Sequence, residues 1–269
     1  MNEISAYEQK FNILVEESVK SGVKPLELRF QPACDCNYGE IRAIRSELRV
    51  NSVLAGVIDP ENYLAQSDEQ TLTEISLKAI DKAIKAINAL ESRGVRYKFL
   101  SVKVDTAIAL NADPYSLIKT ALEKASATGE KLCLEFPASV TDISGEKLKN
   151  AFSDIRAAKV KIAVGGYGGE NFAMEKLLSA CPNVIYTDPT LAKLALSDEK
   201  AAAVAPMLNF AKSLGAEIIA DGVENDDELR EFRSRDALAF IPSENYRGNT
   251  AVKKGFITLK DVIGGNDYD

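Results

Sequence analysis

The order of apolar and polar positions predicts alternating strands and helices along most of the chain. Residues 5–20 carry apolar side chains at helical spacing, and a long amphipathic helix is expected from about Thr71 to Leu90. Further helices are expected at 114–127, 145–157, 170–180, 198–214 and 226–234. Apolar and β-branched runs predict strands at Leu26–Phe30, Glu40–Val50, Phe99–Val104, Lys131–Phe136, Val160–Val164, Val184–Tyr186, Glu217–Ala220 and Ala237–Phe240.

This alternation favours an α/β fold with a mostly parallel sheet, closed or doubly wound. The first two strands are joined by the short turn Cys34–Gly39, so they must be antiparallel. Eight strands, the opening pair included, fit a TIM-like (β/α)8 barrel, and 269 residues with 46% hydrophobic content suit one such domain. We expect a helix within residues 1–25 to pack on the barrel, the barrel to span 26–263, and the polar tail 264–269 to be frayed.

Composition excludes several classes of function. The chain has no histidine, so mechanisms that need an imidazole base or a histidine–zinc site are excluded. The net charge of −7, without a long basic run, argues against nucleic-acid and anionic-membrane partners. No apolar run reaches the ~18 residues of a membrane span and the N-terminus does not resemble a signal peptide, so a cytoplasmic location is expected. Cys34 and Cys36 have no second pair to complete a zinc set, which favours reduced thiols.

Four glycines stand directly after one predicted strand. Gly165, Gly166, Gly168 and Gly169 follow the apolar run Val160–Val164. Glycine allows unusual backbone angles and close backbone approach, and the carboxyl ends of barrel strands are where sites are built. The spacing matches neither a P-loop nor G-x-G-x-x-G. A flexible turn and a phosphate cradle both remain open interpretations.

The segment Val160–Phe172, V-K-I-A-V-G-G-Y-G-G-E-N-F, resembles the DDFGTGYSS loop of EAL domains, the bacterial phosphodiesterases of cyclic di-GMP. Both aspartates are replaced, by Gly165 and Gly166. The resemblance extends from about Leu26 to Pro242 through further short segments in the same order. These are Arg45–Arg49 against E-A-L-L-R, Gly56–Ala65 against G-x-I-x-P-x-x-F-I-P-x-A, Leu100–Val104 against L-S-V-N-L, Leu134–Ala138 against L-E-I-T-E, and Ala220–Glu224 against A-E-G-V-E.

The resemblance implies an EAL-type barrel that lacks most of the catalytic residues. EAL domains hydrolyse phosphodiesters with two divalent metal ions, which need several carboxylate ligands. Four ligand positions of the family are occupied here by Arg45, Lys103, Gly165 and Gly166, and the catalytic lysine is replaced by Tyr186. We therefore expect no metal cofactor and no meaningful hydrolysis. The acids that match the family pattern are Glu135, Asp188 and Asp221.

Two interpretations of these residues stay open at the level of sequence. In the first, Arg45 and Lys103 form an internal salt-bridge network with Glu135, Asp188 and Asp221 where the metals would be. In the second, Arg45, Arg49 and Lys103 form a metal-free phosphate clamp, because arginine suits bidentate phosphate contacts. Backbone donors of Gly165 and Gly166 would then add to it, and Glu224, which matches a guanine contact of the family, would hold the base.

Three functions follow, in order of preference. The first is a catalytically inactive EAL-like domain that regulates by binding another protein, through the barrel surface or the helices after Gly169 that the family uses to form homodimers. The second is a receptor that binds cyclic di-GMP without metal and without hydrolysis. The third is a residual or altered phosphodiesterase that uses Tyr186, Asp188 and Glu135.

Overall fold

The computed structural model describes residues 26–37, 39–52, 56–58, 67–169, 172–197, 199–248, 255 and 257–263. The helix predicted within 1–25 and the tail 264–269 lie outside these residues, as does most of the segment Gly56–Ala65. Among the helices of the described residues, none combines the length and the apolar character needed to cross a bilayer.

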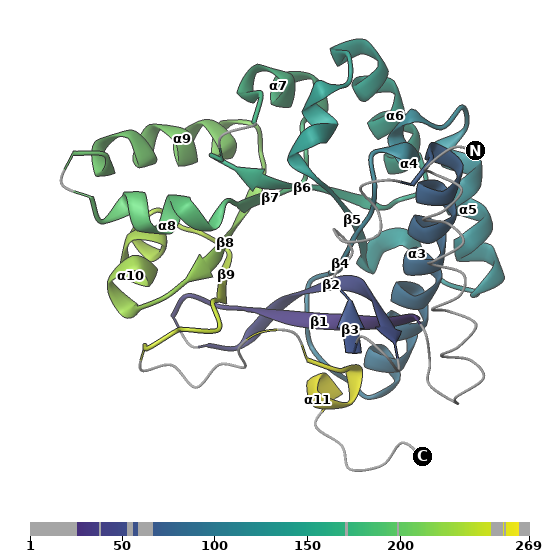
Figure 1. Cartoon of the computed structure of the whole chain (residues 1–269), viewed down its shortest axis with the longest axis horizontal. Coiled ribbons are helices and arrows are strands. Elements are labelled where there is room, and N and C mark those ends of the chain that lie inside the picture. The colour runs from purple at the N-terminus through teal and green to yellow at the C-terminus, as the bar shows by residue number, and fades with distance from the viewer. Residues whose placement is uncertain are drawn as a thin grey trace.

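Eight strands close into a barrel that is surrounded by helices (Figure 1). The strands from β2 through β4 to β9 run parallel, whereas β1 is antiparallel to both of its neighbours. This confirms the predicted α/β barrel with an antiparallel opening pair. Around the ring the strands are β1 Leu26–Cys34, β9 Ala239–Pro242, β8 Glu217–Val223, β7 Val184–Thr187, β6 Lys161–Tyr167, β5 Leu132–Phe136, β4 Leu100–Lys103 and β2 Ile41–Ser52.

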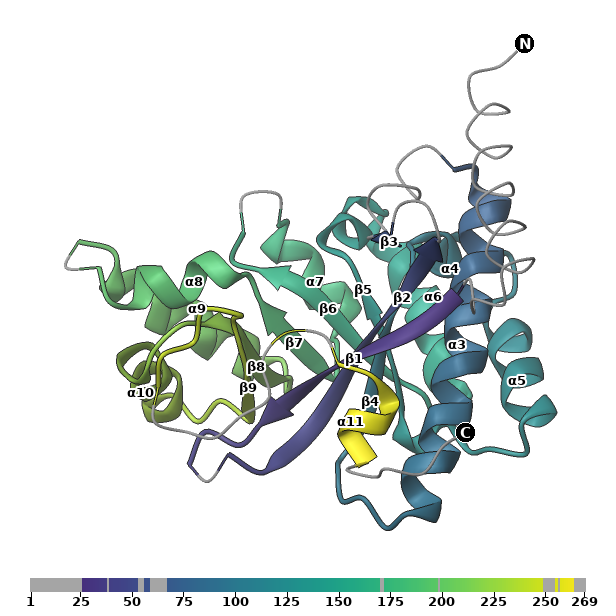
Figure 2. The ribbon, with the colours of Figure 1, turned by 60° about the horizontal axis from the view of Figure 1, so that its bottom comes forward.

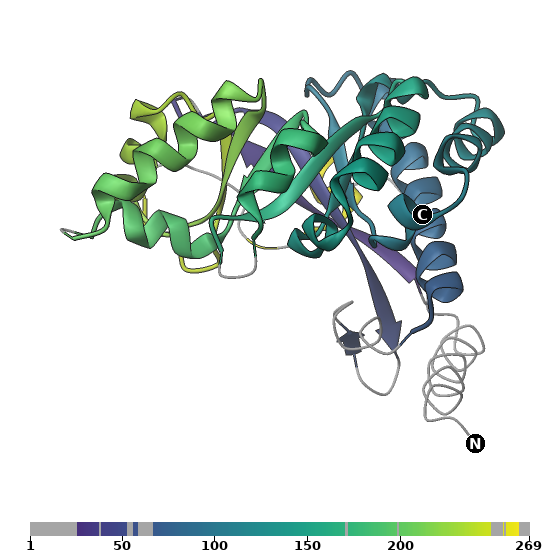
Figure 3. The same cartoon turned by 90° about the horizontal axis from the view of Figure 1, so that it is seen from above.

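The β1–β2 pair is longer than the barrel wall. β2 pairs with β4 only over Ile44–Ser46, yet it continues along β1 as far as Val50, opposite Leu26. The far part of this ribbon therefore projects beyond the ring, as Figures 2 and 3 show. A short strand that the sequence pattern did not predict, β3 Gly56–Ile58, pairs antiparallel with the end of β2.

The helices follow the predicted alternation with some differences, and the short helices α4 Ala107–Leu110 and α11 Leu259–Ile263 were not predicted. Of the predicted helix 170–180, the described part forms a 3-10 turn, Met174–Lys176, and the short helix α7. The predicted helix 198–214 begins only at Ala201, and α8 before it was not predicted. The helices are α3 Glu69–Ser92, α4 Ala107–Leu110, α5 Pro114–Lys124, α6 Gly145–Ala157, α7 Leu177–Ala180, α8 Pro189–Ala195, α9 Ala201–Ser213, α10 Asp226–Ser234 and α11 Leu259–Ile263.

Two hydrophobic clusters hold the barrel together. The larger one packs the helices onto the outer face of the sheet, with Ile80, Ile84 and Ile87 of α3 among its buried members. The smaller one fills the inside of the barrel, because alternate side chains of each strand point inward. It consists of Ala33, Ala43, Phe99, Cys133, Ala163, Val184, Tyr186, Ile219, Ala239 and Ile241. The interior is thus a packed core.

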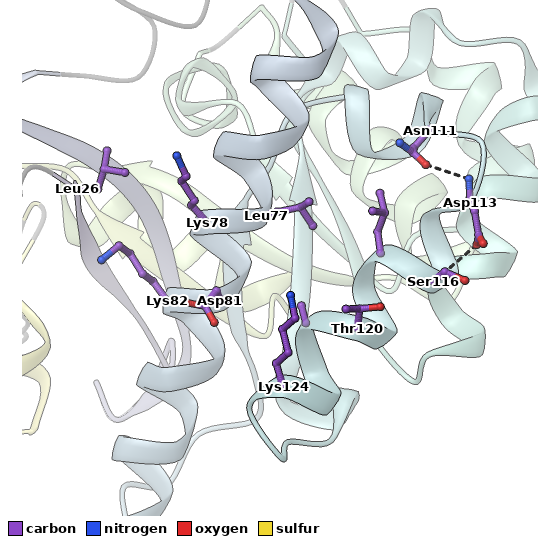
Figure 4. Close-up of a pocket in the computed structure, with 12 residues that line it drawn as sticks. Leu26, Leu77, Lys78, Asp81, Lys82, Asn111, Asp113, Ser116, Thr120 and Lys124 are labelled. Carbon is purple, nitrogen blue, oxygen red and sulfur yellow. Dashed lines mark hydrogen bonds between the residues drawn. The ribbon is translucent and has the colours of Figure 1, made fainter. Parts of the chain in front are cut away.

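A groove of about 820 Å³ lies outside the barrel, between α3 and α5 (Figure 4). Apolar side chains of Leu26, Leu77 and Leu117 line it, together with the cationic side chains of Lys78 and Lys124. None of the polar residues of the barrel mouth contributes to its wall.

The four cysteines are free, and their environments predict unequal reactivity. Cys34, Cys36 and Cys133 are buried, and burial raises the pKa of Cys34 to about 11 and that of Cys36 to about 12. Cys181 is exposed. Because the thiolate is the reactive form, we expect Ellman's reagent at pH 8 to modify one thiol per folded chain quickly and the other three only after unfolding. Rapid reaction of more than one thiol would contradict the described packing.

Candidate functional site

The candidate site lies at the carboxyl ends of the parallel strands, where the packed interior gives way to polar side chains. The backbone alternation brings side chains of several strands to this mouth. Arg45 comes from β2, Lys103 from β4, Glu135 from β5 and Asp221 from β8. The ladder places Lys103 beside Glu135 and Arg45 beside Ser101.

Arg45 occupies the centre of the mouth between two carboxylates. Its Nε donates to Oε2 of Glu135 at 2.9 Å, and one terminal nitrogen lies 2.5 Å from Oε1 of the same carboxylate. The other terminal nitrogen donates to Oδ2 of Asp221 at 2.5 Å. The Arg45 side chain is only 9% exposed and that of Glu135 only 3%. One cation therefore bridges two acids from opposite parts of the barrel wall.

The charges of this cluster keep Arg45 ionised. Burial alone would lower the pKa of the Arg45 guanidinium, but the charges of Glu135 and Asp221 outweigh it and raise that pKa well above its ordinary value. A buried ion pair persists only when its geometry and hydrogen bonds offset the cost of removing both charges from water. The bidentate contact with Glu135 meets this requirement.

Tyr186 closes the floor of the mouth below Arg45. Its ring lies under the guanidinium, 4.8 Å from its central carbon, and its hydroxyl is 2.6 Å from Oγ of Ser101. Burial, and then the charge of Glu135, raise the pKa of the Tyr186 hydroxyl well above 10. At neutral pH Tyr186 is therefore a neutral hydrogen-bonding group and a poor general base.

Glu47 was not expected to matter, yet it organises the other two cations of the site. Its Oε1 lies 2.7 Å from Nε of Arg49, and its Oε2 lies 2.5 Å from Nζ of Lys103. The expectation that Lys103 joins the acids Glu135, Asp188 and Asp221 is thus wrong. The alternation of side chains along β2 already placed Glu47 on the same face as Arg45 and Arg49, but its partner on β4 depends on the strand register.

Asp188 takes a structural position instead of joining the network. It is the N-cap of α8, where its carboxylate accepts from the backbone N–H of Thr190 at 2.9 Å and from the Thr190 hydroxyl at 2.6 Å. Glu224 lies beyond the end of β8 and pairs with exposed Lys193 at 3.1 Å. The Arg45 cluster therefore gathers Glu135 and Asp221, but neither Asp188 nor Glu224.

The glycine stretch is part of the sheet and less of a loop than predicted. β6 continues through Gly165 and Gly166 to Tyr167, with an irregular register after Val164. A Cβ atom on Gly165 would stand 3.1 Å from Oε1 of Glu135. Gly166 has a φ of +73°, which favours glycine. Because Gly165 has no side chain, the space beside it is available to the ion pair of Arg45 and Glu135.

The residues present do not suit a divalent metal. Hard cations such as Mg²⁺ and Mn²⁺ require several oxygen ligands. The two acids that face each other, Glu135 and Asp221, both bind Arg45, whose fixed charge would repel a metal ion between them. Within the described part of the chain, no group of three or more Cys, Asp or Glu side chains is placed to hold a metal ion.

The barrel, its antiparallel first strand and the acids at its mouth are features that can be compared with those of known protein families. The EAL domain family matches residues 17–240. The chain therefore belongs to the EAL domain family.

Solved structures at low sequence identity share this fold. The "EAL Enzyme Bd1971" in its cGMP-bound form has a TM-score of 0.80 and 16% identity, covering 96% of this chain and 69% of that chain. The "PaMucR Phosphodiesterase, c-di-GMP complex" has a TM-score of 0.76 and 18% identity, covering 90% and 98%. The FimX EAL domain of Xanthomonas citri, in complex with c-diGMP, has a TM-score of 0.71 and 18% identity, covering 88% and 94%. No curated protein matches the sequence.

Proposed function

We propose that this chain is a catalytically inactive EAL domain that acts as a regulatory, protein-binding module in cyclic di-GMP signalling. The observation that carries the proposal is the position of Arg45, whose guanidinium binds both Glu135 and Asp221 at the centre of the mouth. A two-metal hydrolysis needs those carboxylates as ligands and needs the space between them. In this chain the permanently charged guanidinium of Arg45 binds both carboxylates.

The remaining side chains offer no substitute mechanism for hydrolysis. Tyr186 is held protonated, Asp188 caps α8, and Glu135 is bonded to Arg45. A residual or altered phosphodiesterase is therefore the least supported of the three functions.

Hydrolysis is the direct test of the inactive state. We expect wild-type protein with Mg²⁺ or Mn²⁺ to release no linear dinucleotide from cyclic di-GMP above a protein-free blank. An active EAL domain assayed alongside should exceed it by at least about 10⁴, since loss of one catalytic group alone can cost about 10²–10⁴. Turnover that Glu135→Gln abolishes would contradict the proposal, whereas turnover that this variant keeps would indicate a contaminating enzyme.

The partner-binding role is assigned to the outer surface of the domain, because the barrel mouth catalyses no reaction in this proposal. Leu178 of α7 is 58% exposed and Leu196, just after α8, is 44% exposed. Both lie in the helical region after Gly169 that EAL domains use to form homodimers. We place the contact with a partner protein, or with a second copy of the chain, in this region.

A metal-independent receptor for cyclic di-GMP is the second candidate, and Glu224 favours it. Its only described side-chain ion pair is the contact with Lys193, whose side chain is 61% exposed. Such surface pairs contribute about 0–1 kcal/mol, so Glu224 can exchange Lys193 for a ligand at little cost. Two of the similar structures contain this dinucleotide. Tight calorimetric binding of cyclic di-GMP in EDTA, lost in Arg49→Ala, would establish the receptor over the partner-binding module.

A further inference from the structure

The groove between α3 and α5 presents apolar side chains that are only partly covered (Figure 4). Leu77 of α3 and Leu117 and Ala121 of α5 line it and are half-buried. Leu26, the first residue of β1, is also half-buried and lines the same groove. Apolar surface gains free energy when it is removed from water, and a hydrophobic groove between two helices suits the apolar face of a third helix.

The chain enters the domain beside this groove. Residues 1–25 precede Leu26 directly, and the sequence predicts a helix over 5–20 within them. Only residues 21–25 connect that helix to Leu26, and five residues span at most about 17 Å. A short connection of this kind holds the helix close to the groove and gives it a high effective concentration there.

The apolar positions of 5–20 fall on one side of the predicted helix. Residues three and four apart are neighbours on a helix surface, and this spacing joins Phe11, Leu14, Val15 and Val19. Ile13 lies two residues from Phe11 and Val15, so it falls on the opposite side. A helix over 5–20 would be about 24 Å long, which is between about 16 Å for α5 and about 36 Å for α3.

The charges of the two surfaces are opposite in sign. The groove is lined by three lysines and two aspartates, namely Lys78, Lys82, Lys124, Asp81 and Asp113. Residues 5–20 carry three acids and two lysines, namely Glu8, Glu16, Glu17, Lys10 and Lys20. Figure 4 shows the side chains of Lys78 and Lys82 extending from α3 on the side of Leu26, where the preceding residues join the domain.

We propose that residues 5–20 form an amphipathic helix that docks in the groove between α3 and α5, with its apolar face against Leu77 and Leu117. The occupant of the groove is thus a segment of the chain itself. The helix adds a third element to the pair α3 and α5 and covers their half-buried apolar side chains. This surface is distinct from the region of Leu178 and Leu196 that we assign to a partner, and the proposal does not depend on what the barrel mouth does.

The test counts the thiols of the full chain that react quickly with Ellman's reagent at pH 8. Cys181 is the exposed cysteine of the wild type, and Leu117→Cys adds a thiol in the groove. We expect one fast thiol in Leu117→Cys, because the docked helix covers the new one. We expect two when Leu14→Asp is added, because a charged side chain is not buried against an apolar groove.

Ile13→Asp is the matched control, since it introduces the same charge one residue away on the opposite side of the helix. Added to Leu117→Cys, it should leave the count at one. Two fast thiols in Leu117→Cys alone, or equal counts in the two aspartate variants, would overturn the proposal. Protection that is lost on dilution would assign the groove to a second copy of the chain and would overturn it as well.

The first of these measurements changes nothing within residues 1–25. It therefore remains decisive even if Leu14→Asp unfolds the chain, which would appear as rapid reaction of the buried Cys34, Cys36 and Cys133 too.

Discussion

Replacing Arg45 with methionine should lower the free energy of unfolding by about 3–5 kcal/mol, the usual cost of removing one partner from a buried ion pair. The variant leaves Glu135, which is 3% exposed, and Asp221, which is 16% exposed, without the cation that binds them both. Urea denaturation at neutral pH measures the difference.

Lys85→Met is the matched control for this measurement. Lys85 pairs with Asp81 at 2.6 Å on the exposed surface of α3, and its removal should cost about 0.3–0.5 kcal/mol. Similar losses for the two variants, or an Arg45→Met variant as stable as wild type, would mean that Arg45 does not organise the mouth.

Replacing Gly222 with alanine should be the second large effect, with a loss of about 2–4 kcal/mol from overpacking and an unfavourable backbone angle together. Gly222 has a φ of +73°, and an added Cβ atom would stand 2.6 Å from Cβ of Pro189. Pro189 is the first residue of α8, and Gly222 follows Asp221, so the clash acts on the wall of the mouth. Thermal and urea unfolding both report the change.

Gly215→Ala separates the two causes. Gly215 has a φ of +78°, but nothing lies within 4 Å of the added Cβ atom. The expected loss of stability is therefore about 1–2 kcal/mol, from the unfavourable backbone angle alone. We expect Gly222→Ala to be less stable than Gly215→Ala by at least about 1 kcal/mol. Equal losses would show that α8 moves aside and that its contact with β8 is loose.

The sequence predicted the barrel because its signals are local. Hydrophobic periodicity located the eight strands of the ring, and the short turn after Cys34 required an antiparallel opening pair. The helices 145–157 and 226–234 begin and end where they were expected. The strand β3 was missed because three residues are too few to show a pattern.

The missed helix α8 is more instructive, because its signal was present. Asp188 followed by Pro189 is a capping residue before a proline at the first helical position. The family resemblance places Asp188 among the acids of the site, whereas the structure uses it as the cap of α8.

The site could be predicted only in part, because its contacts depend on strand register and side-chain reach. Arg45 stands at a position where the family has a metal ligand, and this suggested an internal ion pair. The structure contains this ion pair, which Arg45 forms with Glu135 and Asp221. The partner of Lys103 was assigned wrongly. Lys103 and Glu135 are neighbours in the ladder, but Lys103 reaches Glu47 on its other side. Sequence alone gives no basis for choosing between two carboxylates at similar distances.

Mn²⁺ binding to the wild-type chain, measured by titration calorimetry, tests most directly the claim that Arg45 stands where metals would bind. Arg45 holds Glu135 and Asp221 together, so we predict no saturable binding at micromolar Mn²⁺ and no difference between wild type and Glu135→Gln. Saturable micromolar binding that Glu135→Gln abolishes would contradict the account. It would mean that the guanidinium yields its place to a metal ion and that the site remains open to hydrolysis.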